Sequence, residues 1–282
     1  MNDIVDPPLV DAQWLEERLA DKKIKVIEIS GIMIPQNIRG HIRGSVVLDW
    51  RKQLWNPSNR DFLNKGQFED LMSRIGVSNE STVVLVSLKK QFAAYAFWLF
   101  KYYGHRNAYL LNGSLTAWMN QNRELLSGSV TPSKEPITRY VASEPNSSIR
   151  ASRDYVLSKL KNEGTVIVDV RTPEEYRGEL LSAPGSTQEG AYCKGRIPGA
   201  VYFFFEENTS QDERFKPRAE LQRLYESKGI SKDKEVLIYC RTGHRSTFAW
   251  FVLTYLLGYP NVRVYDGSWT EWGNLVSAPI EV

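Results

Sequence analysis

The sequence predicts an α/β protein of two tandem domains, each a mainly parallel sheet flanked by helices. The chain has 282 residues, which is about twice a common domain length. Its two halves repeat each other, and in each half short apolar runs alternate with helical patterns, the order typical of parallel sheets. A hydrophobic content of 42% supplies enough apolar side chains for two packed cores.

The repeat is clearest when residues 92–118 are aligned with residues 246–272, an offset of 154. Eight of the 27 positions are identical, whereas composition alone would give about two. The identical pairs are Phe97/Phe251, Leu99/Leu253, Gly104/Gly258, Asn107/Asn261, Gly113/Gly267, Ser114/Ser268, Thr116/Thr270 and Trp118/Trp272. Upstream, the segment 40–46 (GHIRGSV) matches 195–201 (GRIPGAV). A repeat of this length indicates duplicated domains rather than a solenoid.

The second half shows the alternation of elements. Runs of strand length and β-branched composition are 165–170, 235–239 and 262–265. Helical patterns cover 152–161, 219–227 and 246–257, and Gly258 ends the last of them. Strands that alternate with helices pair in parallel, because each crossover helix returns the chain to the same edge of the sheet.

Composition also indicates where the domains meet. Residues 127–147 carry Ser, Thr and Pro without sustained periodicity, so they are predicted to link a first domain, 1–126, to a second, 148–282. Residues 178–195 have no counterpart in the first half and are expected to form a surface insertion.

Charge and composition exclude several classes of protein. The 36 Lys and Arg residues against 33 Asp and Glu leave a net charge of +3, too small to predict nucleic-acid binding. The longest apolar runs, 92–100 and 248–257, are shorter than the roughly 20 residues of a membrane span, and the first residues lack the pattern of a signal peptide. Two cysteines and three histidines give no clustered ligands, so no metal or cofactor is expected. These features predict a cytoplasmic protein without membrane partners.

The strongest chemical signal is the segment YCRTGHRS at 239–246. Cys240 follows an apolar strand and precedes a helical pattern, so it is expected at the carboxyl end of a strand, facing a helix N-terminus. Loop N–H groups favour a thiolate there, Arg241 and Arg245 add positive charge, and Gly243 allows a tight loop. A lone cysteine after a strand is usually an inert core residue, but two arginines and a histidine beside it favour the reactive alternative.

Residues 236–282 resemble the active-site half of the tandem-domain rhodaneses, the thiosulfate sulfurtransferases. The blocks DVRTPEEY at 169–176, GRIPGA at 195–200 and VLDWR at 47–51 extend the resemblance over essentially the whole chain. In that family the first domain is a degenerate copy, and a cysteine of the second accepts a sulfane sulfur as a persulfide. The resemblance implies that Cys240 is the nucleophile and sulfur carrier. It also implies that the substrate sulfonate and the persulfide are bound by the loop residues Arg241, Thr242, Gly243, His244 and Arg245.

Other residues near this loop are expected to support it. Asp169 and Arg171 end the preceding strand of the domain, and they either line the site or form a structural ion pair that holds the loop. Ser246, at the start of the following helix, is a further supporting residue. His244 is either a proton donor or a solvated loop histidine. Cys193, on the insertion, is expected to be a bystander thiol rather than a resolving cysteine.

The reaction that the resemblance implies is a double displacement. The Cys240 thiolate takes the outer sulfur of thiosulfate, sulfite leaves, and cyanide or a thiol then removes the sulfur. The expected partners are therefore a small-molecule sulfur donor and a thiophilic acceptor, with thioredoxin or a sulfur-relay protein as candidate acceptors.

Three alternatives stay open. A 3-mercaptopyruvate sulfurtransferase usually reads C-G-[ST]-G-V-T in this loop, where Arg241 stands here in place of the first glycine. A rhodanese-fold phosphatase separates its cysteine and arginine by five residues, whereas four residues separate Cys240 from Arg245. A non-catalytic binding module would not need an intact cysteine loop.

The chain departs from the family pattern at three positions. Arg196 replaces the usual histidine, Thr242 stands where animal-type enzymes have lysine, and Glu175 stands where some mercaptopyruvate-using relatives have arginine. The last two bear on the choice of donor. In the first domain, Ser87 occupies the position of Cys240 and the loop after it is one residue shorter, so this copy is expected to be inactive.

Overall fold

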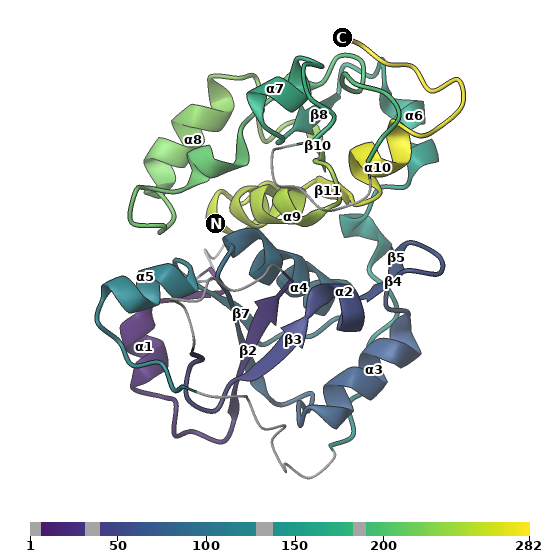
Figure 1. The fold of residues 1–282 in the computed structure, drawn as a ribbon. Helices are drawn as coiled ribbons and strands as arrows, with labels where there is room; N and C mark the ends of the chain where they lie inside the picture. The colour runs from purple at the N-terminus through teal and green to yellow at the C-terminus, as the bar shows by residue number, and fades with distance from the viewer. Residues whose placement is uncertain (1–6, 32–39, 128–137, 183–189) are drawn as a thin grey trace. The chain divides into compact units, whose positions relative to one another are not determined.

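The computed structural model describes residues 7–31, 40–127, 138–182 and 190–282. The chain divides into two compact units (Figure 1). Unit 1 comprises Met1–Asn146 with Gln211–Phe215, and unit 2 comprises Ser147–Ser210 with Lys216–Val282. The short segment 211–215 therefore belongs to unit 1 although it lies in the second half of the sequence. The linker limits expected at 127 and 147 stay a prediction.

Within the described residues, unit 1 is built on a five-stranded parallel sheet in the order β1-β7-β6-β2-β3. Its strands are β1 (Leu9–Val10), β2 (Ile24–Ser30), β3 (Val46–Asp49), β6 (Thr82–Ser87) and β7 (Ala108–Leu111). Its helices are α1 (Ala12–Glu16), α2 (Trp50–Gln53), α3 (Lys65–Arg74), α4 (Lys90–Tyr102) and α5 (Leu115–Asn120). A short antiparallel pair joins β4 (Trp55–Asn56) to β5 (Asp61–Phe62). The parallel order confirms the predicted fold class.

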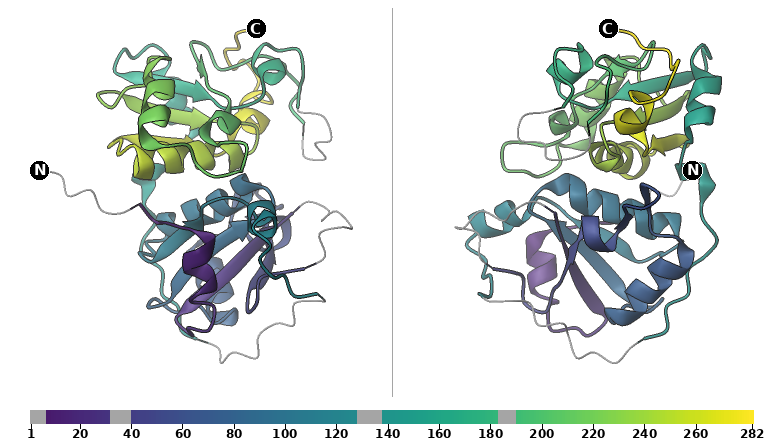
Figure 2. Two further views of the ribbon diagram at one scale, coloured as in Figure 1. Left: turned by 90° about the vertical axis from the view of Figure 1, so that its left-hand side faces the viewer. Right: turned by 45° about the vertical axis from the view of Figure 1, so that its right-hand side comes forward.

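Helices cover both faces of this sheet (Figures 1 and 2). On one face, α1 and α5 pack over Val26, Val84 and Val86, and contribute Leu15 and Trp118 to the same core. The helix α4 lies against β2, β6 and β7, and its residues 92–100 are all buried. A helix that is apolar all round belongs in the interior of a protein, which explains this position.

Residues 138–146 are bound to unit 1, and we call this segment the strap. For example, Thr138 Oγ1 donates to the carbonyl of Val77 (2.6 Å). Backbone N–H groups that donate to side chains or carbonyls of unit 1 belong to Thr138, Tyr140, Val141, Ala142, Ser143 and Asn146. The strap is therefore held to unit 1, the unit to which residues 138–146 belong.

The strap covers a buried histidine. The hydroxyl of Tyr140 lies 3.2 Å from Nδ1 of His105, and Nε2 of the same ring lies 3.1 Å from the carbonyl oxygen of Ser81. Because a carbonyl can only accept, Nε2 carries the proton and Nδ1 accepts the hydrogen bond of Tyr140. Both rings are buried. The neutral imidazole thus joins Ser81, the residue before β6, to the strap.

The described part of unit 2 has a four-stranded parallel sheet in the order β11-β10-β8-β9. Its strands are β8 (Thr165–Asp169), β9 (Val201–Tyr202), β10 (Glu235–Tyr239) and β11 (Val262–Tyr265). Its helices are α6 (Arg153–Lys159), α7 (Pro173–Tyr176), α8 (Arg218–Glu226), α9 (His244–Phe251) and α10 (Ser268–Trp272), with short 3-10 turns at Ser147–Ile149 and Phe205–Asn208. A π-helical turn over Val252–Leu256 continues α9. The alternation predicted for this half is confirmed.

The register of this sheet brings three chain segments to one edge. Tyr239, the last residue of β10, pairs with Asp169 at the end of β8 and with Tyr265 at the end of β11. On one face, α6 and α10 pack around Ile167 and Leu237, while α9 lies against β10 and β11. The loops that leave the three strands therefore begin side by side, at the position where open α/β sheets carry their sites.

Part of the expected insertion, residues 183–189, lies outside the described residues. The end of the insertion is held to the loop after α10. The N–H of Tyr192 donates to Asn274 Oδ1 (2.9 Å), and the N–H of Cys193 donates to the carbonyl of Gly273 (3.1 Å). The side chain of Cys193 is exposed.

Across the four described stretches, no helix combines the length and the apolar character needed to cross a membrane. The same stretches bring together no group of three or more His, Cys, Asp or Glu side chains that could hold a metal ion.

Candidate active site

Cys240 directly follows β10 at the carboxyl edge of the unit 2 sheet, and it is 1% exposed. The loop after it turns into α9 at Gly243, which has a φ of +86°. A Cβ at this position would lie 3.2 Å from the carbonyl oxygen of Asp266. Both the left-handed backbone and the close approach require a residue without a side chain, so glycine lets the loop close tightly beside the cysteine.

The hydroxyl of Ser246, in the first turn of α9, lies 3.7 Å from the sulfur of Cys240. The same hydroxyl is 2.7 Å from the carbonyl oxygen of Gly243. Ser246 is fully buried, so it ties the start of α9 to the loop and places a hydroxyl next to the sulfur. The first turn of α9 also presents the positive end of its helix dipole to this region.

Arg245 forms a bidentate ion pair with Glu175, with distances of 2.7 and 3.0 Å. Glu175 is fully buried. Burial would raise the pKa of this carboxyl, but the hydrogen bonds and charge of Arg245 outweigh it and hold the pKa below its usual range. Glu175 also closes a capping box with Thr172 at the start of α7. The TPEE segment therefore begins a helix and supplies the counter-ion of the loop arginine.

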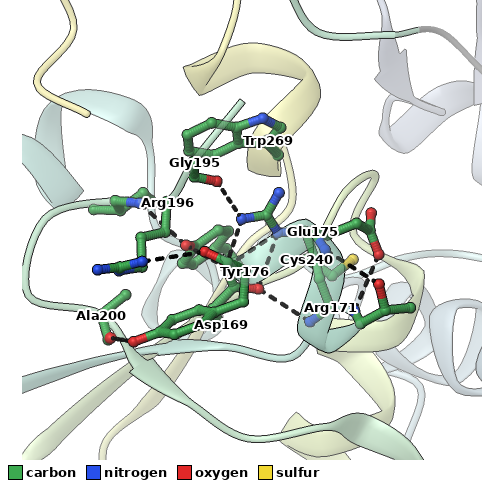
Figure 3. A network of polar contacts seen from close by, with 12 residues as sticks. Asp169, Arg171, Glu175, Tyr176, Gly195, Arg196, Ala200, Cys240 and Trp269 are labelled. Carbon is green, nitrogen blue, oxygen red and sulfur yellow. Dashed lines mark hydrogen bonds and ion pairs between the residues drawn. The ribbon is translucent and has the colours of Figure 1, made fainter. Parts of the chain in front are cut away.

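Asp169 and Arg171 form a second ion pair, which is completely buried (Figure 3). The Nε of Arg171 donates to both carboxylate oxygens, at 3.0 and 3.1 Å. Its Nη2 donates to Asp169 (2.7 Å) and to the carbonyl of Gly195 (2.7 Å). These contacts join the end of β8 to the turn before β9, as expected of a structural ion pair. A direct contact of Asp169 or Arg171 with substrate stays a prediction.

Aromatic side chains complete this buried pair. The hydroxyl of Tyr239 donates to Asp169 Oδ2 (2.6 Å) and accepts the N–H of Ile197 (3.1 Å). Burial and the Asp169 carboxylate raise the pKa of Tyr239, so its hydroxyl stays protonated. The indole of Trp269 lies 4.6 Å from the guanidinium of Arg171, in the geometry of a cation–π contact. The end of β10, which precedes Cys240, is thus held in place by this buried pair and its aromatic neighbours.

The remaining loop residues are also enclosed. Arg241 and His244 are each 4% exposed. The hydroxyl of Thr242 lies 3.1 Å from Nδ1 of His244. The alternative of a solvated histidine is therefore wrong, because His244 is buried as the first residue of α9.

The start of α10 binds the backbone of Cys240. These contacts were not predicted from the sequence. The N–H of Cys240 donates to Ser268 Oγ (3.1 Å). The N–H of Trp269 donates to the carbonyl of Cys240 (3.1 Å), and that of Thr270 to the carbonyl of Arg241 (3.0 Å). The available signal was the repeat, in which the Gly-Ser pair at the start of this helix, Gly267 and Ser268, matches Gly113 and Ser114 of the first half.

A family model for the rhodanese-like domain matches residues 11–121 and 152–275, most of both halves. The chain belongs to the rhodanese-like family. Similar proteins include the sulfur carrier protein TtuD of Thermus thermophilus, which is 46% identical over 276 residues, 96% of this chain and 95% of that protein. A putative thiosulfate sulfurtransferase of Mycolicibacterium smegmatis is 42% identical over 275 residues, and one of Haloferax volcanii is 42% identical over 286 residues, with at least 97% of each chain covered.

The rhodanese-like fold is also found in solved structures of EanB. A complex with ergothioneine superimposes with a TM-score of 0.85 at 24% sequence identity, over 98% of this chain and 70% of that one. Wild-type EanB gives a TM-score of 0.81 at 23% identity, over 98% and 69%. At this identity the likeness concerns the fold.

The first rhodanese-like copy closes its equivalent loop differently. Ser87 is buried at the end of β6, and its hydroxyl donates to the carbonyl of Lys89 (2.7 Å) and accepts the N–H of Ala93 (3.1 Å). The helix α4 begins already at Lys90. The hydroxyl of Ser87 is thus bound to the backbone of the loop and of the first turn of α4, and the inactivity of this copy stays a prediction.

Two further residues lie beside the site without entering it. Arg196 pairs with Glu281, and its guanidinium stacks 4.6 Å from the ring of Tyr176 (Figure 3). These contacts hold the turn before β9 in place. The carbonyl of Cys193 accepts the indole N–H of Trp269 (2.9 Å), while its thiol is exposed.

Proposed function

We propose that this protein is a thiosulfate sulfurtransferase that carries a sulfane sulfur on Cys240 as a persulfide. The observation that carries the proposal is the placement of the Cys240 sulfur: it is enclosed at the carboxyl edge of the sheet, beside the Ser246 hydroxyl and the start of α9. The names of the similar proteins, a sulfur carrier and putative thiosulfate sulfurtransferases, support the same chemistry.

The proposed reaction has two displacements. The Cys240 thiolate attacks the outer sulfur of thiosulfate, the sulfur–sulfur bond breaks, and sulfite leaves with the bonding electron pair. The cysteine then holds a persulfide. Cyanide or an acceptor thiolate attacks the outer sulfur of this persulfide, and the Cys240 thiolate leaves with its electrons. The protein returns to its starting state, and no net oxidation of the protein occurs.

Charge in the loop would stabilise the anions of both steps. The outer nitrogens of Arg245 already bind Glu175, so in the proposal Arg245 holds the end of the loop and adds its charge to the start of α9. We assign the sulfonate oxygens of the donor to Arg241 and to the loop N–H groups. Thr242, Gly243 and His244 shape the turn that aims these groups.

Mass spectrometry tests the persulfide directly. After incubation with thiosulfate, the intact protein should gain the mass of one sulfur atom, and the peptide that contains Cys240 should carry it. The Cys240→Ser variant should gain nothing, and the matched Cys193→Ser variant should gain one sulfur as the wild type does. Sulfur on Cys193, or activity lost in the Cys193 variant, would overturn the assignment.

The second candidate function is 3-mercaptopyruvate sulfurtransferase, and the identity of residue 241 separates the two. A charge-assisted hydrogen bond from Arg241 to a sulfonate is worth roughly 1.5–3 kcal/mol. The Arg241→Gly variant should therefore lose roughly one to two orders of magnitude in turnover of thiosulfate, and should lose less with mercaptopyruvate. Equal losses with both donors would show that Arg241 does not discriminate.

For the acceptor we propose a small thiophile or a protein thiol in the cytoplasm, such as thioredoxin or a sulfur-relay protein. The sulfur-carrier name of the relative from Thermus thermophilus supports a protein acceptor. Release of the sulfur from the persulfide form by reduced thioredoxin, compared with cyanide at equal concentration, tests this choice.

A further inference from the structure

Ser268 has a backbone conformation that serine rarely adopts. Its φ is +53°, in the left-handed region, and the residue is fully buried. The equivalent residue of the first copy, Ser114, has an ordinary φ of −100°, and there the preceding Gly113 has the positive φ, +112°. In unit 2 the preceding Gly267 has a φ of −56°. The same Gly-Ser pair thus carries its positive φ on glycine in one copy and on serine in the other.

The left-handed conformation places the Ser268 hydroxyl between two backbone groups. It accepts the N–H of Cys240 (3.1 Å) and donates to the carbonyl of Tyr265 (2.7 Å). Cys240 and Tyr265 are both buried. In the first copy, by contrast, Ser114 accepts an N–H from Ala117 of its own helix. Strain at a residue that contacts a reactive site indicates a functional constraint.

The turn at Ser268 also orients the first two peptide groups of the Cys240 loop, those that contain the carbonyls of Cys240 and Arg241. The carbonyls of Cys240 and Arg241 accept hydrogen bonds from the N–H groups of Trp269 and Thr270. A trans peptide group carries its C=O and N–H on opposite sides. Because both carbonyls face α10, the N–H groups that follow them, those of Arg241 and Thr242, face away from α10.

We propose that Ser268 is the positioning residue of the Cys240 loop. Its strained backbone fixes the first peptide groups of the loop with their carbonyls toward α10, so that the N–H groups are turned to the sulfur. The inference rests on the proposed function, because a thiolate and a persulfide are the anions that such N–H groups stabilise. Ser268 itself acts through Cys240 and touches no substrate.

The test uses the full-length chain with Cys193→Ser, so that Cys240 is the one thiol that reacts. The variants are Ser268→Ala, which removes the hydroxyl, and Ser268→Gly, which removes the hydroxyl and also relieves the positive φ. The matched control is Ser114→Ala in the first copy. For each protein we would measure the rate of alkylation by iodoacetamide from pH 5 to 10, the first turnover with thiosulfate, and unfolding in urea.

Both Ser268 variants should slow the alkylation of Cys240 about tenfold across the pH range, because a loop N–H that is no longer held toward the sulfur loses one charge-assisted hydrogen bond to the thiolate. The first turnover with thiosulfate should slow about tenfold. Ser268→Gly should unfold at a urea concentration no lower than Ser268→Ala, because glycine adopts the left-handed conformation without strain. Ser114→Ala should keep the alkylation profile of the parent.

An unchanged alkylation profile in both Ser268 variants would overturn the proposal. So would a loss of reactivity that merely follows the loss of folded protein in urea, because Ser268 would then be a stability residue. Alkylation needs no sulfur donor. A parent protein that alkylates normally but takes no sulfur from thiosulfate would therefore refute the proposed function, and the two failures are distinguishable.

Discussion

Acidification from pH 7 to pH 4 is expected to destabilise unit 1 through His105. The ring is 3% exposed, and as a neutral imidazole it already uses both nitrogens, toward Ser81 and Tyr140. A second proton on Nδ1 would oppose the hydroxyl hydrogen of Tyr140 and would bury a positive charge near Lys101. The folded state therefore resists protonation of this histidine.

Burial lowers the pKa of His105 from 6.5 to about 4; the Lys101 charge adds to this effect and the hydrogen bond to Ser81 opposes it. Above pH 6.5 the imidazole is neutral in both the folded and the unfolded chain, and its full contribution to stability is present. Between pH 6.5 and 4 the unfolded chain binds the proton and the folded chain does not, so stability falls as the pH falls. The difference of about 2.5 pKa units corresponds to about 3 kcal/mol.

Two measurements check this value. The NMR titration of the His105 ring should have its midpoint near pH 4, and urea unfolding at pH 7, 6, 5 and 4 should give the free energy of unfolding. His105→Gln should remove about 3 kcal/mol of the loss between pH 7 and 4, whereas the control His41→Gln should retain it. The carboxylates are the same in all three proteins, so their contribution cancels in the comparison. A midpoint between pH 6 and 7, or the same loss in His105→Gln, would refute the reasoning.

Three further predictions concern the candidate site and the first rhodanese-like copy. Glu175→Gln should leave the Arg245 charge buried without a counter-ion and lower the free energy of unfolding by about 3–5 kcal/mol in urea; a loss below about 1 kcal/mol would mean that the pair is effectively solvated. Tyr239→Phe removes a hydroxyl that bridges a buried carboxylate and a backbone N–H, and should lower the free energy of unfolding by about 1–3 kcal/mol in the same assay. An unchanged free energy of unfolding would show that the network rearranges to satisfy both groups. Ser87→Cys in a Cys240→Ser background should show no turnover of thiosulfate; measurable turnover would reveal an intact loop geometry in the first copy.

Periodicity and spacing were enough to predict the sheets and the position of Cys240. The apolar run before Cys240 and the glycine after it determine a strand, a tight turn and a helix, and these are local properties of the sequence. The repeat aligns the residues of the two copies from the sequence alone. The parallel order and the helices on the sheet follow from the alternation of elements.

Contacts between distant segments could not be predicted in the same way. Arg245 and Glu175 are seventy residues apart, and nothing in either motif states that they pair. The exchange of the positive φ between Gly267 and Ser268 is invisible in the sequence, since the first copy has the same two residues. Many of the hydrogen bonds that bind the strap to unit 1 come from its backbone N–H groups, and composition does not record them.

Glu175 has two structural roles, and together they restrict which substitutions its position tolerates. The same carboxylate caps α7 through Thr172 and neutralises Arg245. Arginine at position 175, as in some mercaptopyruvate-using relatives, would remove the cap and set two guanidinium groups against each other in a buried space. The single substitution Glu175→Arg is therefore expected to lower the stability of the folded protein. Replacing Arg245 alone would likewise leave the buried Glu175 carboxylate without a counter-ion, so these two positions are expected to tolerate a change of charge only when both are replaced together.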